Sequence, residues 1–257
     1  MARLPSCMIL PYSGPDGVLS NGPGPAPPRA GRGLTGMWRE QAGTRRVKGL
    51  TSWIAALVLA AGLATGARAD SAADCFSEDL DRRITGCTAL IEQGDQNAAD
   101  LSYAYAMRAL AYSLKGRYET AIHDYDMAIS MRPDFAVALN NRAWALFRWG
   151  KASDGLPDVE RSLELSPTSA HSLDTRAHIK QALGDPKSAL RDYDRAMWYG
   201  GARMIRLYQC GLTEQKLYSG EIDGTWRPEV TKALEACVLD KTCDPLPADE
   251  QCRAATS

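Results

Sequence analysis

The sequence predicts an all-α protein, a solenoid of helix–turn–helix repeats, because one pattern recurs three times between residues 102 and 201. Three glycines recur at intervals of 34 residues, at Gly116, Gly150 and Gly184. Two prolines, three alanines, three arginines and three aspartates share this interval: Pro133 and Pro167; Ala109, Ala143 and Ala177; Arg108, Arg142 and Arg176; Asp124, Asp158 and Asp192. A fixed period of this length, with a glycine in mid-repeat and a closing proline, is typical of stacked helical hairpins.

The first unit, residues 102–135, shows how the pattern specifies two helices. Four residues at helical spacing are predicted to share one face of the first helix: Tyr105, Arg108, Ala109 and Tyr112. Gly116 ends that helix, because glycine accepts the left-handed conformation common at helix C-termini. Pro133 ends the second helix. One hairpin cannot bury its apolar face alone, so neighbouring units must stack.

The second and third units depart from the pattern in places. In the second unit, residues 136–169, glycine and proline stand at Gly155 and Pro157. Because proline suits only the first turn of a helix, the second helix of this unit is expected to start late or to be the loosest of the three. In the third unit, residues 170–201, Gly201 replaces the closing proline. The array is therefore expected to become less regular towards its end.

These repeats resemble the tetratricopeptide repeat family. The resemblance implies a right-handed solenoid in which the first helix of each repeat lines a groove that binds a peptide of another protein. By position, the groove residues would be Tyr103, Leu110, Asn140, Asn141, Trp144, Arg148, His171, Asp174 and His178. The subtype that clamps the carboxylates at a peptide's C-terminus is not expected, because only Asn141 of its polar and basic set is present.

Trp144 allows two interpretations. Asn140, Trp144 and Arg148 fall on one stripe of a helix, and a tryptophan beside an arginine and an amide suits the binding of a peptide. Aromatic side chains serve equally well in packing between helices. Trp144 is therefore either an interface anchor or part of the core.

Residues 1–69 are predicted to be a leader that ends in a cleavable signal peptide. A basic flank, an apolar run at residues 53–65 and a small-x-small site at residues 67–69 form the pattern of an export signal. The run is shorter than the roughly 20 residues that span a membrane, so no stable span is expected after cleavage. The alternative is an uncleaved anchor, and Met37 is an alternative start. The mature protein is expected in the periplasm or outside the cell.

The formal charge of −1 hides an asymmetry along the chain. Residues 1–69 carry 8 Lys and Arg against 2 Asp and Glu, a net charge of +6, whereas residues 70–257 carry 22 against 29, a net charge of −7. A nucleic-acid-binding surface needs a basic face. The acidic mature chain is therefore not expected to bind nucleic acid.

Removal of the leader leaves six cysteines: Cys75, Cys87, Cys210, Cys237, Cys243 and Cys252. An even number in an exported chain predicts disulfides, and the spacings do not fit a zinc module. Cys75 and Cys87 are predicted to pair, because more than a hundred residues separate them from the others. The other four cysteines allow three connectivities, which remain open.

The residues before the repeats, 70–101, carry a shorter helical pattern: Leu80, Ile84, Cys87, Leu90 and Ile91. This pattern predicts the second helix of an incomplete repeat. End units of a solenoid need special treatment, because one of their faces has no neighbour. Residues 70–101 are therefore expected to cap the N-terminal end of the array.

Residues 202–257 are predicted to form a small helical module held by disulfides. Within it, residues 203–238 contain a Tyr-x-Gly-x-Ile-Asp-Gly loop before a helix that starts with proline. This stretch resembles the peptidoglycan-binding-like module of cell-wall hydrolases. The resemblance implies a glycan-binding surface formed by Gln209, Tyr218, Asp223 and Trp226. Arg227 and Cys237 depart from the family, which favours the other interpretation, a cap that stabilises the array and binds peptidoglycan weakly or not at all.

No catalytic centre, metal site or cofactor is predicted. The repeated arginines and aspartates recur with the fold, whereas a catalytic centre occurs once, so they are expected to pair between helices. His171, Asp174 and His178 share a helical face, but the two histidines lie two turns apart, about 10 Å, which is too far to share one ion. The expected function is that of a scaffold or adaptor that binds another protein; a cell-envelope protein that binds peptidoglycan is the alternative.

Overall fold

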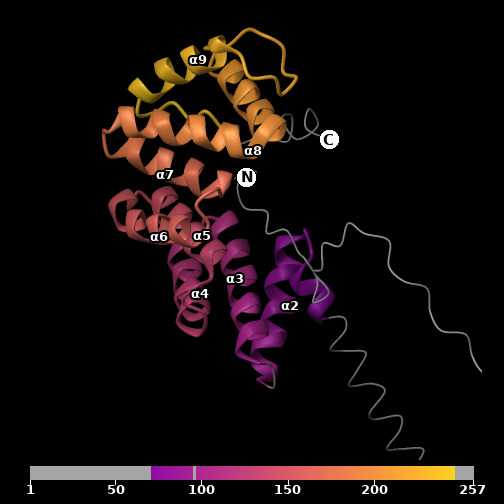
Figure 1. Ribbon diagram of the computed structural model, residues 1–257. Helices are drawn as coiled ribbons and strands as arrows, with labels where there is room; N and C mark the ends of the chain where they lie inside the picture. Colours follow the sequence, from indigo (N-terminus) through magenta and orange to yellow (C-terminus); the bar gives the residue numbers. More distant parts are fainter. Residues whose placement is uncertain (1–70, 95–96, 247–257) are drawn as a thin grey trace, which may run out of the picture. The chain divides into compact units, whose positions relative to one another are not determined.

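The computed structural model describes residues 71–94 and 97–246, and within these ranges the regular structure is entirely helical (Figure 1). All of these residues belong to one compact unit. None of the helices in this part of the chain is long and apolar enough to cross a membrane. The predicted leader and signal peptide, residues 1–69, lie outside the described residues, as does Cys252.

The three predicted repeats are three pairs of helices, which can be followed in order in Figure 1. The repeats pair α3 with α4, α5 with α6, and α7 with the first part of α8: Ala98–Leu114, Tyr118–Met131, Ala136–Arg148, Ala152–Leu165, Ala170–Ala182 and Pro186–Glu214. Each helix packs against the next, and α3 also contacts α5, as α5 contacts α7. Helices α3, α5 and α7 therefore form one layer, and the predicted helical solenoid is confirmed.

The turn glycines and the small alanines act as the sequence predicts. Gly116, Gly150 and Gly184 have φ angles of 74°, 82° and 84°, in the left-handed region that favours glycine. The alanines at the helix crossings are fully buried: Ala109, Ala121, Ala128, Ala143, Ala177, Ala189 and Ala196. Their small size lets the paired helices approach closely.

The expected late start of the second helix in the second repeat is wrong. Helix α6 begins at Ala152, in register with α4 and α8, and Pro157 lies inside it. Proline removes one hydrogen bond from a helix interior and crowds the preceding turn. Here the turn at Gly150 and the burial of Val159 and Leu163 fix the start of the helix, so tertiary packing outweighs the local preference.

Gly155 is required by the contact between α5 and α6. A Cβ atom at this position would lie 2.7 Å from the carbonyl oxygen of Ala143, which is backbone and cannot move aside. We therefore expect Gly155→Ala to lower the free energy of unfolding by about 1–3 kcal/mol, the usual cost of overpacking, although alanine is the better helix former. A denaturant melt measures this, with Ser153→Ala on the exposed side of α6 as the control; equal or higher stability of Gly155→Ala would contradict the expectation.

The repeated arginines and aspartates form a ladder of ion pairs, as predicted. Each arginine of the first helix holds the aspartate of the second helix with two nitrogens, at distances between 2.6 and 2.9 Å: Arg108–Asp124, Arg142–Asp158 and Arg176–Asp192. The third nitrogen of Arg142 also reaches Asp126 of the preceding repeat, at 2.5 Å. The ladder therefore joins helices within a repeat and, at Arg142, between repeats.

The N-terminal cap consists of α2 (Leu80–Gln93) and a helical turn at residues 71–75. Helix α2 packs on α3, and the predicted disulfide between Cys75 and Cys87 is present, buried against Ala104 and Met107. A disulfide that closes a loop of this size stabilises a protein by about 3 kcal/mol in the chain-entropy account.

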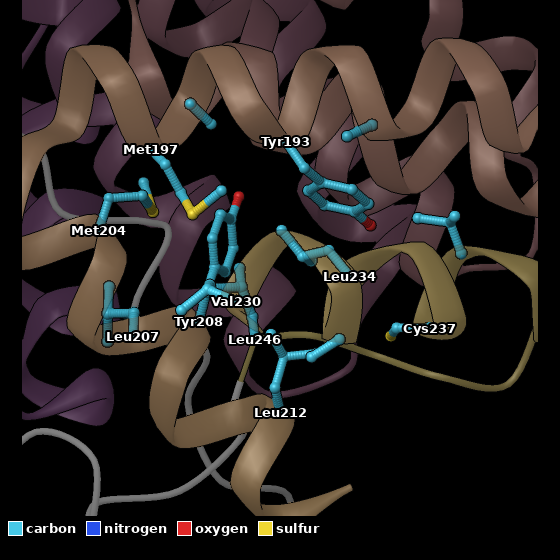
Figure 2. Packing of buried hydrophobic residues seen from close by; sticks show 14 of the residues in the cluster. Tyr193, Met197, Met204, Leu207, Tyr208, Leu212, Val230, Leu234, Cys237 and Leu246 are labelled. Carbon is cyan, nitrogen blue, oxygen red and sulfur yellow. The ribbon is translucent and has the colours of Figure 1, made fainter. Parts of the chain in front are cut away.

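The C-terminal module is helical and linked by a disulfide, as predicted. Helix α8 bends at Gly201, where φ is 59°, and its second part packs against α9 (Pro228–Leu239). Figure 2 shows the shared core, in which Tyr193 and Met197 from before the bend meet side chains from after it and from α9: Tyr208, Leu212, Val230 and Leu234. This core is continuous with that of the third repeat, so the module caps the array.

The cysteine pairing left open by the sequence is partly resolved. Cys237 pairs with Cys243 within the C-terminal module, and Cys210 is also disulfide-bonded. Peptide mapping without reductant is therefore expected to recover Cys75–Cys87, Cys237–Cys243 and a third bond that contains Cys210. Alkylation of any of these five cysteines in the native, unreduced protein would contradict this arrangement.

Candidate functional site

The predicted groove residues lie on α3, α5 and α7, and we call this side of the three helices the groove face. Leu110, Trp144 and His178 occupy equivalent positions in the three repeats. Trp144 packs in a cluster with Leu110, and the ring of His178 meets the ring of Trp144 edge-on, with centroids 5.2 Å apart. The three side chains thus form one continuous strip across the repeats.

Trp144 lies inside this strip and is not an exposed anchor. Its side chain is 1% exposed, and it packs against Leu110, Leu114 and Phe147. The guanidinium of Arg148 lies 5.8 Å from the centre of its ring. Of the two interpretations of Trp144, packing against the neighbouring helices is the one that fits this geometry.

Several polar atoms of the groove face have no hydrogen-bond partner. Asn140 donates its amide to Asn141 at 3.3 Å, but its own Oδ1 accepts nothing. Three further buried atoms on α5 and α7 also lack a hydrogen-bond partner: the donor Trp144 Nε1, and His171 Nδ1 and Thr175 Oγ1. Burial also lowers the pKa of His171, which favours its neutral form. An unpaired buried polar group costs about 1–3 kcal/mol, so these atoms represent unused hydrogen-bonding capacity.

Most of the nine residues predicted to line the groove are not accessible to a partner, which corrects that prediction. Tyr103 is 37% exposed, Arg148 is exposed and His171 is half-buried. The other members are buried: Leu110, Asn140, Asn141, Trp144, Asp174 and His178. Leu110 and Trp144 pack against each other between neighbouring first helices, whereas Asp174 and His178 also contact Tyr208 and Asp244 from the C-terminal part of the chain. The exposed ring of Tyr103 is held edge-on to Phe135, with centroids 4.9 Å apart.

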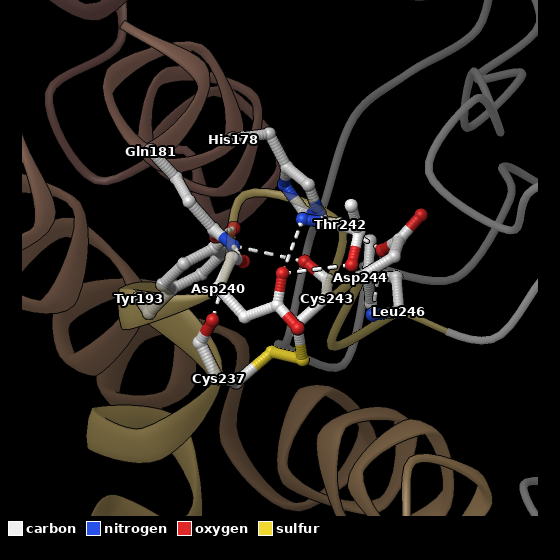
Figure 3. The surroundings of a disulfide bond; sticks show 9 residues. All are labelled: His178, Gln181, Tyr193, Cys237, Asp240, Thr242, Cys243, Asp244 and Leu246. Carbon is white, nitrogen blue, oxygen red and sulfur yellow. Dashed lines mark hydrogen bonds and ion pairs between the residues drawn. A yellow bond between two sulfur atoms is a disulfide. The ribbon is translucent and has the colours of Figure 1, made fainter. Parts of the chain in front are cut away.

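His178 is the centre of a buried charge network, of which Figure 3 shows the link to Asp244. Its Nε2 lies 3.1 Å from the carboxylate of Asp244, and its Nδ1 lies 2.9 Å from the backbone carbonyl of Asp174 and 3.6 Å from the Asp174 carboxylate. Tyr208 donates its hydroxyl to the same carboxylate. The sequence reasoning placed His178 and Asp174 in the groove but did not foresee Tyr208 or Asp244 as their partners.

This network makes His178 a cation at neutral pH. Burial alone would lower the pKa of His178, but the carboxylates of Asp174 and Asp244 outweigh burial and raise it to about 9. Since the folded-state pKa is raised above the ordinary 6.5, the stabilisation from this imidazolium is complete below pH 6.5. It is lost as the pH rises through about 9.

Residues 240–246, which we call the docked loop, lie against α7 beside this network. The amide nitrogen of Gln181 donates to the carbonyl oxygens of Cys237, Asp240 and Cys243 at 3.3, 2.8 and 2.9 Å (Figure 3). Its oxygen accepts the hydroxyl of Tyr193. Sequence reasoning missed Gln181, although it stands 34 residues after Phe147 on the groove face, because no repeat pattern indicates that the chain after α9 returns to α7.

A pocket of about 300 Å³ lies between α5, α7 and the docked loop. Its lining comes from all three: Phe147, Arg148, His178, Gln181, Ala182, Lys241, Thr242, Cys243 and Asp244. A larger pocket of about 370 Å³ is lined by residues such as Glu160, Pro167 and Arg195, and none of the predicted groove residues lines it. We call the first one the α5–α7 pocket.

The residues predicted to bind glycan build a loop instead of an open surface. Gln209 is buried and accepts the backbone N–H of Gly224 at 2.8 Å, and its amide donates to the carbonyl of Thr225. Asp223 accepts from the backbone of Thr225 and pairs with Arg227 at 2.7 Å, which holds the pKa of Asp223 well below its usual range. The residue that departs from the family pattern, Arg227, thus completes the loop.

The two aromatic residues of that set differ. Tyr218 is buried in the module core and donates its hydroxyl to the carbonyl of Glu221, whereas Trp226 is 53% exposed. The predicted glycan-binding surface therefore needs correction: Gln209 and Tyr218 are buried, and Asp223 binds the backbone of its own loop. Within residues 71–94 and 97–246, no group of three or more His, Cys, Asp or Glu side chains could hold a metal ion.

The comparison with protein families agrees with the architecture. The model of the tetratricopeptide repeat matches residues 102–135, which are the first of the three repeats. A search among curated proteins found no match. The matched repeat and the two helical pairs that follow it at the same period support a tetratricopeptide repeat protein with an all-helical solenoid fold.

Proposed function

We propose that the protein binds a peptide segment of another protein along its groove face and acts as a scaffold or adaptor. The observation that carries this proposal is the set of buried polar atoms on α5 and α7 that lack partners: Asn140 Oδ1, Trp144 Nε1, His171 Nδ1 and Thr175 Oγ1. A peptide backbone supplies both donors and acceptors, so it can satisfy such a set. The all-helical repeat fold is typical of interaction modules that are not enzymes.

Exposed side chains on the same face support the proposal. Tyr103 presents an aromatic ring on α3, and Val137 occupies the equivalent position on α5; both are exposed. Tyrosine is among the residues that contribute most to protein interfaces, because it buries a large area at a small entropic cost. Asn140 and Trp144 follow Val137 on α5 by about one and two helical turns, and their unpaired atoms are buried. A partner that binds at Val137 must therefore displace neighbouring side chains to form hydrogen bonds with these atoms.

The proposal includes export to the periplasm. It is supported by the basic flank, the short apolar run and the small-x-small site in residues 45–69. The disulfides Cys75–Cys87 and Cys237–Cys243 also support it, because such bonds persist in oxidising compartments. Cell fractionation followed by intact-mass analysis tests this part: the mature chain is expected in the periplasm with its N-terminus near Asp70.

Binding of peptidoglycan through residues 203–238 is the less favoured proposal. Only Trp226, of the four residues predicted for it, combines an aromatic ring with a largely exposed surface. We expect purified sacculi not to retain the protein. Retention that Trp226→Ala abolishes would favour the cell-wall function instead.

Site-specific photo-crosslinking tests the groove function. Benzoylphenylalanine is placed at Tyr103 or Val137 on the groove face, and at Arg161 of α6 or Lys187 of α8 on the other helix layer as controls. After illumination of living cells, a protein adduct is expected from the two groove positions and not from the controls. Adducts from the controls alone, or from none of the four positions, would contradict the proposal.

A further inference from the structure

We propose that the α5–α7 pocket receives an acidic side chain of the partner segment, with the docked loop as one wall of the binding site. This inference rests on the proposed function and names the chemistry of the partner. It assigns the C-terminal module a role in recognition beyond that of a cap.

The docked loop is firmly attached to the groove face. The amide nitrogen of Gln181 donates to the carbonyls of Asp240 and Cys243 in the loop and to that of Cys237 just before it. His178 binds the carboxylate of Asp244. The Cys237–Cys243 disulfide closes the loop from the other side, and Leu246 is buried in the module core (Figure 3). A wall held in this way keeps its shape, which limits the entropy lost on binding.

The α5–α7 pocket is lined by three basic side chains, those of His178, Arg148 and Lys241. His178 is satisfied by two carboxylates, those of Asp174 and Asp244. Arg148 and Lys241 also line the pocket, and neither has an ion pair with a carboxylate among the described residues. Arg148 lies within electrostatic reach of Asp244 but is oriented by stacking over the ring of Trp144. The pocket therefore presents two cationic groups that can take up one further carboxylate.

The size of the pocket and the rest of its lining also suit an acidic side chain. Phe147 and Ala182 provide apolar surface for the methylene groups of an Asp or Glu side chain. The volume of about 300 Å³ accommodates such a side chain together with ordered water. A loop that only capped the array would have no need of an open pocket lined by two cationic groups without carboxylate partners.

The test uses the full-length protein and a phage-displayed library of short random peptides. Peptides selected on the wild-type protein are expected to be enriched in Asp and Glu relative to the unselected library. The affinity of one selected acidic peptide is then measured by fluorescence anisotropy. Arg148→Gln and Lys241→Gln are each expected to weaken it about fivefold or more, the level at which an interface residue counts as a contributor.

A matched control and a salt series complete the test. Arg161→Gln removes the same charge from an exposed site on α6 and should leave the affinity unchanged. Rising salt should weaken binding to the wild type more than to Arg148→Gln, because the lost interaction is between charges. Selected peptides without acidic enrichment, or equal affinity for the wild type and both pocket variants, would overturn the inference and leave the groove function standing. Failure of the groove function itself appears in the crosslinking experiment.

Discussion

Replacing Trp144 by alanine is expected to lower the free energy of unfolding by about 3–5 kcal/mol, the usual cost of removing a buried aromatic side chain. The ring is 1% exposed and fills the space between Leu110 of α3 and His178 of α7. Its removal leaves a cavity at the point where three repeats meet. A denaturant melt followed by circular dichroism measures the loss.

Trp149 is the matched control for this change. It ends the same helix, is 38% exposed, and has the ammonium of Lys151 3.5 Å from the centre of its ring. Trp149→Ala should therefore cost about 1 kcal/mol or less, as expected for a surface position. The affinity of both variants for a selected peptide is then measured by calorimetry and compared with that of the wild type. Normal stability of Trp144→Ala together with weakened binding would restore the interpretation of Trp144 as an exposed anchor.

The repeat architecture could be predicted from the sequence because its causes are local and periodic. Turn glycines such as Gly116 and crossing alanines such as Ala109 are needed once in every unit, so their spacing shows in the sequence. The pairing of Arg108 with Asp124 followed from the same repetition. The Cys75–Cys87 bond could be predicted because no other cysteine lies nearby in the sequence.

The candidate site could be predicted only in part, because its geometry depends on contacts between distant segments. The 34-residue spacing of Trp144 and His178 shows in the sequence that they are equivalent positions, but it does not show that their rings pack against each other and are buried. The docked loop meets α7 through pairs about sixty residues apart, such as His178–Asp244. No periodicity encodes such a contact. The prediction from Pro157 was wrong for a different reason: the local preference of proline suggested a late helix start, but tertiary packing determines where α6 begins.

Removing Arg142 alone is expected to destabilise the protein by about 3–5 kcal/mol, because it leaves a largely buried carboxylate without its partner. Arg142 holds Asp158 through two hydrogen bonds of 2.6 and 2.7 Å and also binds Asp126 of the preceding repeat. The side chain of Asp158 is mostly buried. Arg142→Met keeps the volume and removes the charge, and a urea melt measures the change.

The double variant Arg142→Met with Asp158→Leu separates the value of the ion pair from the cost of breaking it. If the ladder mainly fixes the geometry of the helices, an apolar pair of similar volume should recover most of the lost stability, because no buried charge is left unpaired. Arg161→Met breaks an exposed pair with Glu164 on α6 and should change stability by about 1 kcal/mol or less. A double variant as unstable as Arg142→Met would show instead that the pair itself, with its link to Asp126, stabilises the junction between the first two repeats.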